Sequence, residues 1–199
     1  INHFATNTAI NFEDLVINYN GQVNRLPENT SFSGDLEIKH PDFNKMLTEL
    51  GFSYTPAAQS LGIFNLKTGF KGSEQQFDAQ PLAFNIGFNT FNGRLGYEES
   101  ADKRPQITTD LEVNKLELER FLQRGENTAN QPLIDIQSDS VAEFLQRPLW
   151  SKNKIDYGFY HNFDLNGKFK FQELSYQNHN FSNVIANLVA KQGIFEVSN

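Results

Sequence analysis

The residue types that most often carry catalysis are few and scattered in this chain. Its four histidines, His3, His40, His161 and His179, include no pair at the i, i+4 spacing that places two ligands on one helix face. We expect them on the surface or in turns, with a meeting of His161 and His179 across neighbouring strands as the alternative. Because the chain has no cysteine, it has no thiol nucleophile, thiolate metal ligand or disulfide. We predict no metal and no cofactor.

Serine and phosphate chemistry find no better support. Ser73 follows Gly72 but lacks the second glycine and the helix of a Gly-x-Ser-x-Gly nucleophile elbow, so this pair indicates a turn. The chain also has no Gly-x-x-x-x-Gly-Lys loop and no Gly-x-Gly-x-x-Gly after a strand. We predict no catalytic residues and a protein that is not an enzyme.

Two carboxylate pairs are the remaining acid/base candidates, because a glycosidase needs only two such groups. Asp35 and Glu37 alternate with apolar neighbours, and Asp110 and Glu112 do the same. This spacing places each pair on the solvent side of a strand. Asp135 is expected in a loop, and Asp139 or Ser140 is expected to cap a helical pattern over 140 to 146.

The charge balance excludes nucleic acid as the main partner. The formal charge is -7, from 24 acidic and 17 basic residues, and the lysines and arginines are scattered along the chain. A phosphate backbone requires them to be clustered. No apolar run reaches the roughly 20 residues that cross a bilayer. Since residue 1 is Ile, we expect a fragment of a longer chain.

The elements that must position any site are mainly β. Phenylalanine occurs 19 times, largely at every second position, which is the period of a half-buried strand. Alternation changes phase near Glu13-Asp14 and breaks at Asn18 to Gly21, at Gly72-Ser73 and at Asn92-Gly93, so each of these segments predicts a turn or bulge. Two short helices are predicted, over 41 to 50 closed by Gly51 and over 117 to 123.

The chain repeats this design. Asp35-Leu36-Glu37-Ile38 runs into the first helix and Asp110-Leu111-Glu112-Val113 into the second. We interpret residues 1 to 199 as a single β-rich domain with one repeat unit over about 32 to 98. The second unit takes about 107 to 125 plus 155 to 199, around an insertion at about 126 to 154. The predicted fold is a twisted antiparallel sheet or half-barrel with two or three short helices.

The Phe-rich strands suggest a continuous apolar wall, either a closed core or a groove for acyl chains, since such a site needs a large apolar area and few polar groups. The residues predicted to form this wall are Phe64, Leu66, Phe84, Phe88, Phe163, Phe169 and Phe171.

The order of these pieces resembles the AsmA-like family of bacterial envelope proteins, relatives of TamB. The resemblance rests on Phe32 to Ile38 with the following helix, on Leu82 to Tyr97 with Gly93-Arg94-Leu95, on Arg104 to Leu118, and on Asp164 to Phe195. It covers about residues 30 to 199.

The resemblance implies a periplasmic protein held in the inner membrane by a segment outside this chain. It also implies a role in outer-membrane biogenesis, or in phospholipid transport between membranes through an apolar β-groove. The partners it implies are phospholipid and other envelope proteins. The alternative is a β-sandwich recognition module that binds glycan or protein through its loops.

Overall fold

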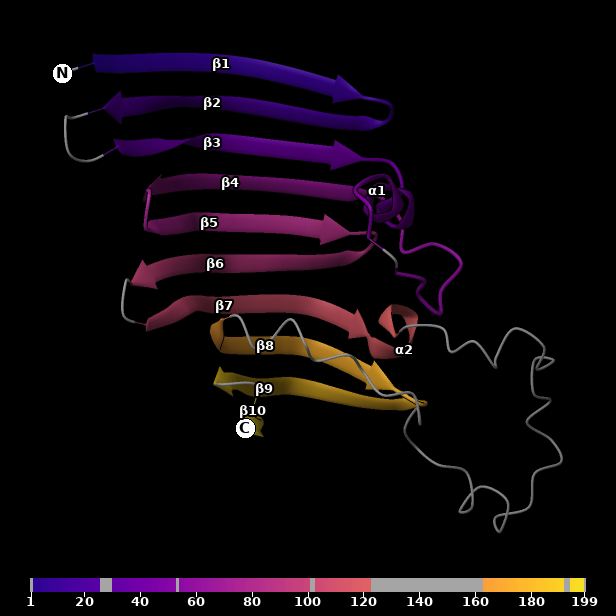
Figure 1. Ribbon diagram of the computed structural model, residues 1–199. Helices are drawn as coiled ribbons and strands as arrows, with labels where there is room; N and C mark the ends of the chain where they lie inside the picture. The colour runs from indigo at the N-terminus through magenta and orange to yellow at the C-terminus, as the bar shows by residue number, and fades with distance from the viewer. Residues whose placement is uncertain are drawn as a thin grey trace, which may run out of the picture.

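The chain forms one open, mostly antiparallel sheet (Figure 1). The computed structural model describes residues 2–25, 30–52, 54–100, 103–122, 163–191 and 194–198. In this part, ten strands lie in the order in which they occur along the chain, and the sheet does not close on itself. The prediction of a mainly β fold with two or three short helices is confirmed, and two helices lie within the described residues.

The strands are β1 (Asn2–Phe12), β2 (Leu15–Arg25), β3 (Thr30–His40), β4 (Phe64–Ser73), β5 (Gln76–Ile86), β6 (Asn89–Ser100), β7 (Lys103–Glu117), β8 (Asp164–Tyr176), β9 (His179–Lys191) and β10 (Ile194–Ser198). The helices are α1 (Phe43–Glu49) and α2 (Leu118–Phe121).

Helix α1 lies within the predicted range of 41 to 50, but it begins at Phe43, two residues later than predicted. The Asp42 carboxylate accepts hydrogen bonds from the backbone N–H groups of Asn44 and Lys45, at 2.9 and 3.1 Å, and so caps the helix. Gly51 follows its end at φ +84°, a backbone conformation that glycine adopts without steric cost. Met46 is the buried residue of this helix and holds it against the sheet.

The core lies under α1 at one end of the sheet. Leu15, Met46, Leu61, Phe64 and Ile86 form its buried cluster, with side chains from β2, β4 and β5 meeting the helix and the loop behind it. In Figure 1, α1 lies at the end of the sheet where β3 and β7 terminate. The hydrophobic core therefore occupies one end of the strands rather than their full length.

The loop from α1 to β4 extends this cover sideways toward α2. Tyr54 donates its phenolic hydrogen to the carbonyl of Phe121. The N–H of Ala57 bonds to the carbonyl of Leu122 at 2.8 Å, and the Arg120 guanidinium reaches the Ser60 carbonyl at 3.2 Å. These hydrogen bonds thus connect the loop after α1 to α2 at the end of the sheet where β3 and β7 terminate.

Two predicted turns are wrong. Asn92-Gly93 lies inside β6, and the chain reverses at Gly87-Phe88 instead, where Gly87 has φ +59°. Gly93 serves a close approach between strands, since an added Cβ would lie 1.8 Å from the Asp110 carbonyl oxygen of β7. The segment ending at Gly21 also continues as β2, with Gly21 paired to a glycine of β3.

Other predicted breaks are confirmed. The phase change at Glu13-Asp14 is the two-residue turn between β1 and β2, with Glu13 at φ 50°. The break at Gly72-Ser73 falls at the end of β4, one residue before the turn into β5. The register also shifts within the β4–β5 and β5–β6 pairs, beside the cis bond from Gln80 to Pro81.

The two predicted repeat units differ in chain direction. Strand β3 is followed by α1 and an antiparallel β4, whereas β7 is followed by α2 and a parallel β8. A parallel partner requires a crossover of a dozen residues or more, and residues 123–162 connect these two strands. The predicted insertion at about 126 to 154, its helix at 140 to 146 and the start of the second unit's part at 155 to 199 lie outside the described residues.

His40 is a structural residue, so its predicted place on the surface or in a turn is wrong. Its side chain has no exposed area, Nδ1 accepts the Asp42 N–H at 3.0 Å, and Nε2 lies 3.2 Å from Glu49. The neutral tautomer that fits both contacts carries its proton on Nε2 and donates it to Glu49. This ring joins the end of β3 to both ends of α1.

We expect His40→Ala to lower the free energy of unfolding by about 1–3 kcal/mol, because it leaves a buried N–H and a carboxylate without their partner. Urea denaturation followed by circular dichroism measures this change. The control is His179→Ala, since His179 is exposed at the start of β9. Equal midpoints for the two variants would contradict the structural role of His40.

Candidate functional site

Every strand presents apolar side chains on one side of the sheet, although Val16, Leu174, Phe181, Ile185 and Val189 lie on the opposite side. The Cα registers pair apolar residues with apolar residues across successive strands, as in Ile17–Ile38, Leu66–Phe84 and Leu111–Phe169. We call this side the apolar face. On β1 to β5 it consists of Phe4, Ile10, Phe12, Leu15, Ile17, Tyr19, Val23, Phe32, Leu36, Ile38, Phe64, Leu66, Phe70, Phe77, Leu82, Phe84 and Ile86. On β6 to β9 it consists of Phe91, Leu95, Tyr97, Ile107, Leu111, Val113, Leu165, Phe169, Phe171, Val184 and Leu188.

Five of the seven residues predicted as an apolar wall lie on this face. Phe64 is buried and packs on Phe43 of α1, with ring centroids 5.3 Å apart. Leu66 and Phe84 are partly buried beside the core, and Phe84 stacks on Phe91 at 4.4 Å.

The other predicted wall residues divide between the face and its margin. Phe169 and Phe171 are half-buried neighbours on β8, with ring centroids 6.4 Å apart. Phe88 does not join the face, because the turn at Gly87 carries it to the tip of the β5–β6 hairpin, where it is 89% exposed. Phe163 is half-buried immediately before β8 and has no place in the strand register.

Sequence reasoning missed the largest group of touching rings on the face. Tyr19 stacks on Phe70 at 5.8 Å, Phe70 stacks on Phe77 at 5.8 Å, and Phe32 contacts both Phe70 and Phe77, at 6.1 and 6.5 Å. We call these four residues the ring cluster. Strict alternation along β5 would place Phe77 and Phe84 on opposite faces, because their positions along the chain differ by an odd number. The register shift near Pro81 returns Phe77 to the face of Phe84. Pro81 was the sequence feature that could have predicted this shift, because proline within a strand often marks a bulge.

The ring cluster lies outside the core that α1 covers. None of its four members belongs to the buried cluster or to the partly buried residues packed against it, and all four are half-buried. Within the described residues, the two helices and the loop between α1 and β4 gather at one end of the strands (Figure 1). The apolar face is therefore covered at that end and partly bare elsewhere.

Glycines on this face make room for aromatic rings. A Cβ at Gly72 would lie 2.6 Å from Cζ of Phe32, one at Gly21 would lie 2.5 Å from the Tyr19 hydroxyl, and one at Gly167 would lie 2.8 Å from Cε2 of Phe169. Each ring thus occupies the space above a glycine instead of standing away from the sheet. Such glycine–aromatic pairs keep rings close to the backbone and pin the register.

The opposite side, which we call the polar face, is held by charged pairs between strands. Glu37 of β3 meets Lys39 at 2.9 Å and Lys67 of β4 at 3.1 Å, and it accepts a hydrogen bond from Asn18 of β2 at 3.2 Å. The hydrogen bonds from Lys39, Lys67 and Asn18 lower the Glu37 pKa to about 2. The predicted placement of Asp35, Glu37, Asp110 and Glu112 on the solvent side is confirmed.

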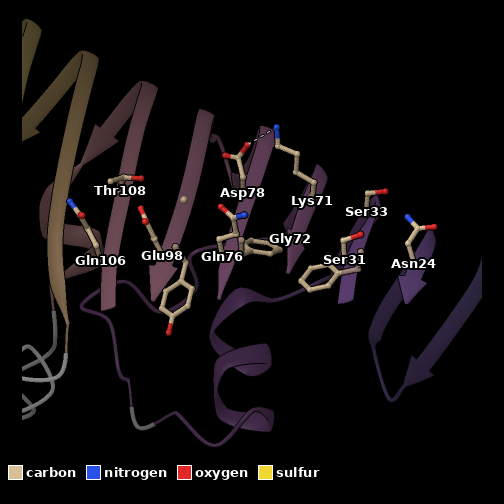
Figure 2. A pocket seen from close by; sticks show the side chains of 14 residues that line it. Asn24, Ser31, Ser33, Lys71, Gly72, Gln76, Asp78, Glu98, Gln106 and Thr108 are labelled. Carbon is tan, nitrogen blue, oxygen red and sulfur yellow. Dashed lines mark ion pairs between the residues drawn. The ribbon is translucent and has the colours of Figure 1, made fainter. Parts of the chain in front are cut away.

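Two of the described hollows lie mainly over the polar face. One, of about 550 Å³, crosses β2 to β7 and is lined by amide, hydroxyl and charged groups together with Phe32, Phe77 and Tyr97 (Figure 2). Lys71 and Asp78 form an ion pair at 3.7 Å there, on the side of the sheet away from the helix. A second hollow, of about 450 Å³, lies over β1 to β5 beside Glu37 and Lys67. A third hollow, of about 760 Å³, lies along residues 180–185 of β9, whose side chains alternate between the two faces.

The described residues contain no group of three or more His, Asp or Glu that could hold a metal ion. His179 is exposed and stacks on Phe181 at 6.4 Å, while His161 lies outside the described residues. The predicted meeting of these two histidines thus also falls outside them. In the same part of the chain, neither helix has the length and apolar character needed to span a bilayer.

Comparison with known proteins identifies no relative: no family model, curated protein or solved structure matches this chain.

We expect Gly167→Ala to lower the free energy of unfolding by about 1–3 kcal/mol, because the added methyl group displaces the Phe169 ring. In a Phe169→Leu background the same change should cost markedly less, since the displaced atoms are gone. Urea unfolding of both single variants and the double variant measures this coupling. Strictly additive effects would show that the ring does not occupy the space above Gly167.

The Glu37 network predicts a pH dependence of stability. Because the pKa falls from 4.5 to about 2 on folding, the contribution of Glu37 is complete above 4.5 and is lost as the pH falls through about 2. We expect Glu37→Gln to melt below the wild type at neutral pH and the two curves to converge toward pH 2. Glu98→Gln, also on the polar face, is the control. A difference that persists unchanged into acid would contradict the assignment.

Proposed function

We propose that this protein is a non-enzymatic, AsmA-like component of the bacterial envelope whose apolar face binds phospholipid acyl chains. The observation that supports the proposal is that one sheet face carries apolar side chains on every strand, while the described helices and loops cover only one end of it. A monomeric soluble protein seldom exposes a contiguous apolar surface of this extent, and such surfaces mark binding sites or membrane contacts.

The chemistry of the apolar face suits acyl chains. Away from the margin of the face, its polar members are uncharged: Thr6, Thr8, Thr68 and Thr109. Charged groups in register with it occur near its margin, at the paired positions Lys115 and Glu173. An acyl chain has no hydrogen-bonding groups, so it loses no hydrogen bonds to water when it lies on such a surface.

The dimensions also suit lipid. Ten strands spaced about 4.8 Å apart make a face roughly 43 Å wide. The hydrocarbon core of a bilayer is about 30 Å thick, so one leaflet's chains span about half of that. Acyl chains therefore fit on the face in several positions, and the proposed role is to hold or conduct them.

The polar face and the described hollows fit the same proposal. A protein that presents lipid on one side of a sheet must remain hydrated on the other, and charged pairs such as Glu37–Lys67 and Glu112–Lys170 supply that hydration. We place the protein in the periplasm, with a membrane anchor outside this chain and other envelope proteins as partners. This assignment rests on the resemblance described above.

Adjacent residues on β4 provide the test. A photoreactive benzoylphenylalanine at Phe70 lies on the apolar face, and one at Lys71 lies on the polar face. After irradiation with vesicles of phosphatidylethanolamine and phosphatidylglycerol, we expect phospholipid adducts at position 70, because only that face contacts acyl chains. Intact-protein mass spectrometry detects them.

The pair at Phe77 and Asp78 on β5 repeats the comparison on the next strand. No adduct at 70 or 77, or equal adducts on both faces, would overturn the lipid proposal. Circular dichroism of each labelled protein verifies that the sheet has formed.

The polar hollow supports a second candidate function, the binding of a polar ligand such as a glycan. Amide and hydroxyl groups from several strands converge there, among them Ser33, Gln76 and Thr108. The β-sandwich expected for a recognition module is not what the described residues form, since they make a single sheet. The same photoreactive proteins separate the two functions, because a glycan probe would label position 71 and spare position 70.

A further inference from the structure

Strand β1 forms one border of the sheet and is unusually open to pairing. It is 11 residues long, runs in unbroken register with β2, and has no described strand on its outer side (Figure 1). Its sequence contains no Lys, Arg, Asp, Glu or Pro. Edge strands are normally protected by charges, proline, bulges or short length. Strand β1 uses none of these devices.

The side chains of β1 are also exposed on the apolar face. Phe4, Ile10 and Phe12 are 59%, 51% and 56% exposed, since each has a neighbouring strand on one side only. Another strand placed along β1 would cover them and satisfy the outward backbone groups together. Both the ladder and the apolar face would then continue beyond the present border.

We propose that β1 pairs antiparallel with β1 of a second copy, around a two-fold axis at Thr8. In that register Phe4 lies opposite Phe12 of the second copy, and Thr6 lies opposite Ile10. On the polar face, Ala5 lies opposite Asn11 and Asn7 opposite Ala9. The strand is thus complementary to itself, which a two-fold interface requires.

Charge and geometry favour β1 of a second copy as the strand that pairs with β1. A two-fold axis perpendicular to the sheet keeps the two apolar faces on the same side, so twenty strands would share one surface. The acidic residues next to β1 are already paired, since Lys45 lies 2.7 Å from Asp14 and 4.0 Å from Glu13. The border at β10 is a poorer partner, because β10 has 5 residues.

Thr8 provides the sharpest test because the axis places its two copies directly opposite one another. Thr8 is exposed, so the single chain tolerates a longer side chain there. Thr8→Lys and Thr8→Glu should each abolish the dimer, because like charges would meet across the axis. Mixing the two variants should restore a dimer through the opposite charges. Thr55→Lys, in an exposed loop, is the matched control.

Sedimentation velocity over a range of concentrations measures the outcome for the full 199-residue chain. The wild type and Thr55→Lys should reach twice 22.7 kDa, each Thr8 variant alone should remain at 22.7 kDa, and the mixture should return to the larger mass. Circular dichroism checks that all variants retain the β spectrum.

Three results would overturn the proposal. A wild type that stays monomeric would exclude the pairing, and Thr8 variants that still dimerise would exclude this register. Growth into open-ended oligomers would show that β1 pairs with β10 of another copy, since such head-to-tail contacts do not close. The pairing does not depend on the proposed function, so a monomer would leave the photolabelling prediction unaffected.

Discussion

The strand register is the constraint on which the rest of this structure depends. Side chains alternate with a period of two, so a slip of one residue in any pair would move the apolar side chains of all later strands to the polar face. The sheet avoids this although the register shifts in the β4–β5 and β5–β6 pairs, because both shifts arise from one extra residue in β5 between Ala79 and Leu82, which brings the two parts of β5 onto the same face. Ion pairs between strands, such as Glu37–Lys67, fix the same register from the polar face.

The cover at one end follows from how the chain connects its strands. Hairpin turns of two residues supply no material to lie over a face, whereas the connection from β3 to β4 contains a helix and a loop. The hydrogen bond between the Asp42 N–H and His40 fixes the start of this connection, and the hydrogen bonds of Tyr54 and Ala57 hold its loop against the end of α2. Within the described residues, this connection thus buries the ends of several strands and does not cover the rest of their length.

Much of the fold was predictable from the sequence because it depends on local alternation. The positions of β3, α1 and the turn at Glu13-Asp14 follow from periodicity, capping and phase. The Asn92-Gly93 turn was wrong because that glycine serves a contact with β7, which no local pattern reveals. The parallel direction of β8 was equally hidden, since alternation is the same for both directions of a strand.

The candidate site was less predictable than the fold. Phe64, Leu66 and Phe84 were found because they share one phase on neighbouring strands, and Phe88 was included because its parity agrees with theirs. Phe88 nevertheless lies off the face, because the chain turns at Gly87-Phe88 before the strand reaches it. The ring cluster was missed because contacts among Tyr19, Phe32, Phe70 and Phe77 depend on the register of four strands, which sequence reasoning did not supply.

The glycines beneath the rings decide what kind of surface the apolar face is. Rings that lie over Gly21, Gly72 and Gly167 fill the low points of the sheet, so the surface has little relief. A surface without ridges holds a flexible chain by the length in contact rather than by a shaped recess. If acyl chains bind there as proposed, each position along the surface has nearly the same energy, and a chain would move from one to the next without crossing a high barrier.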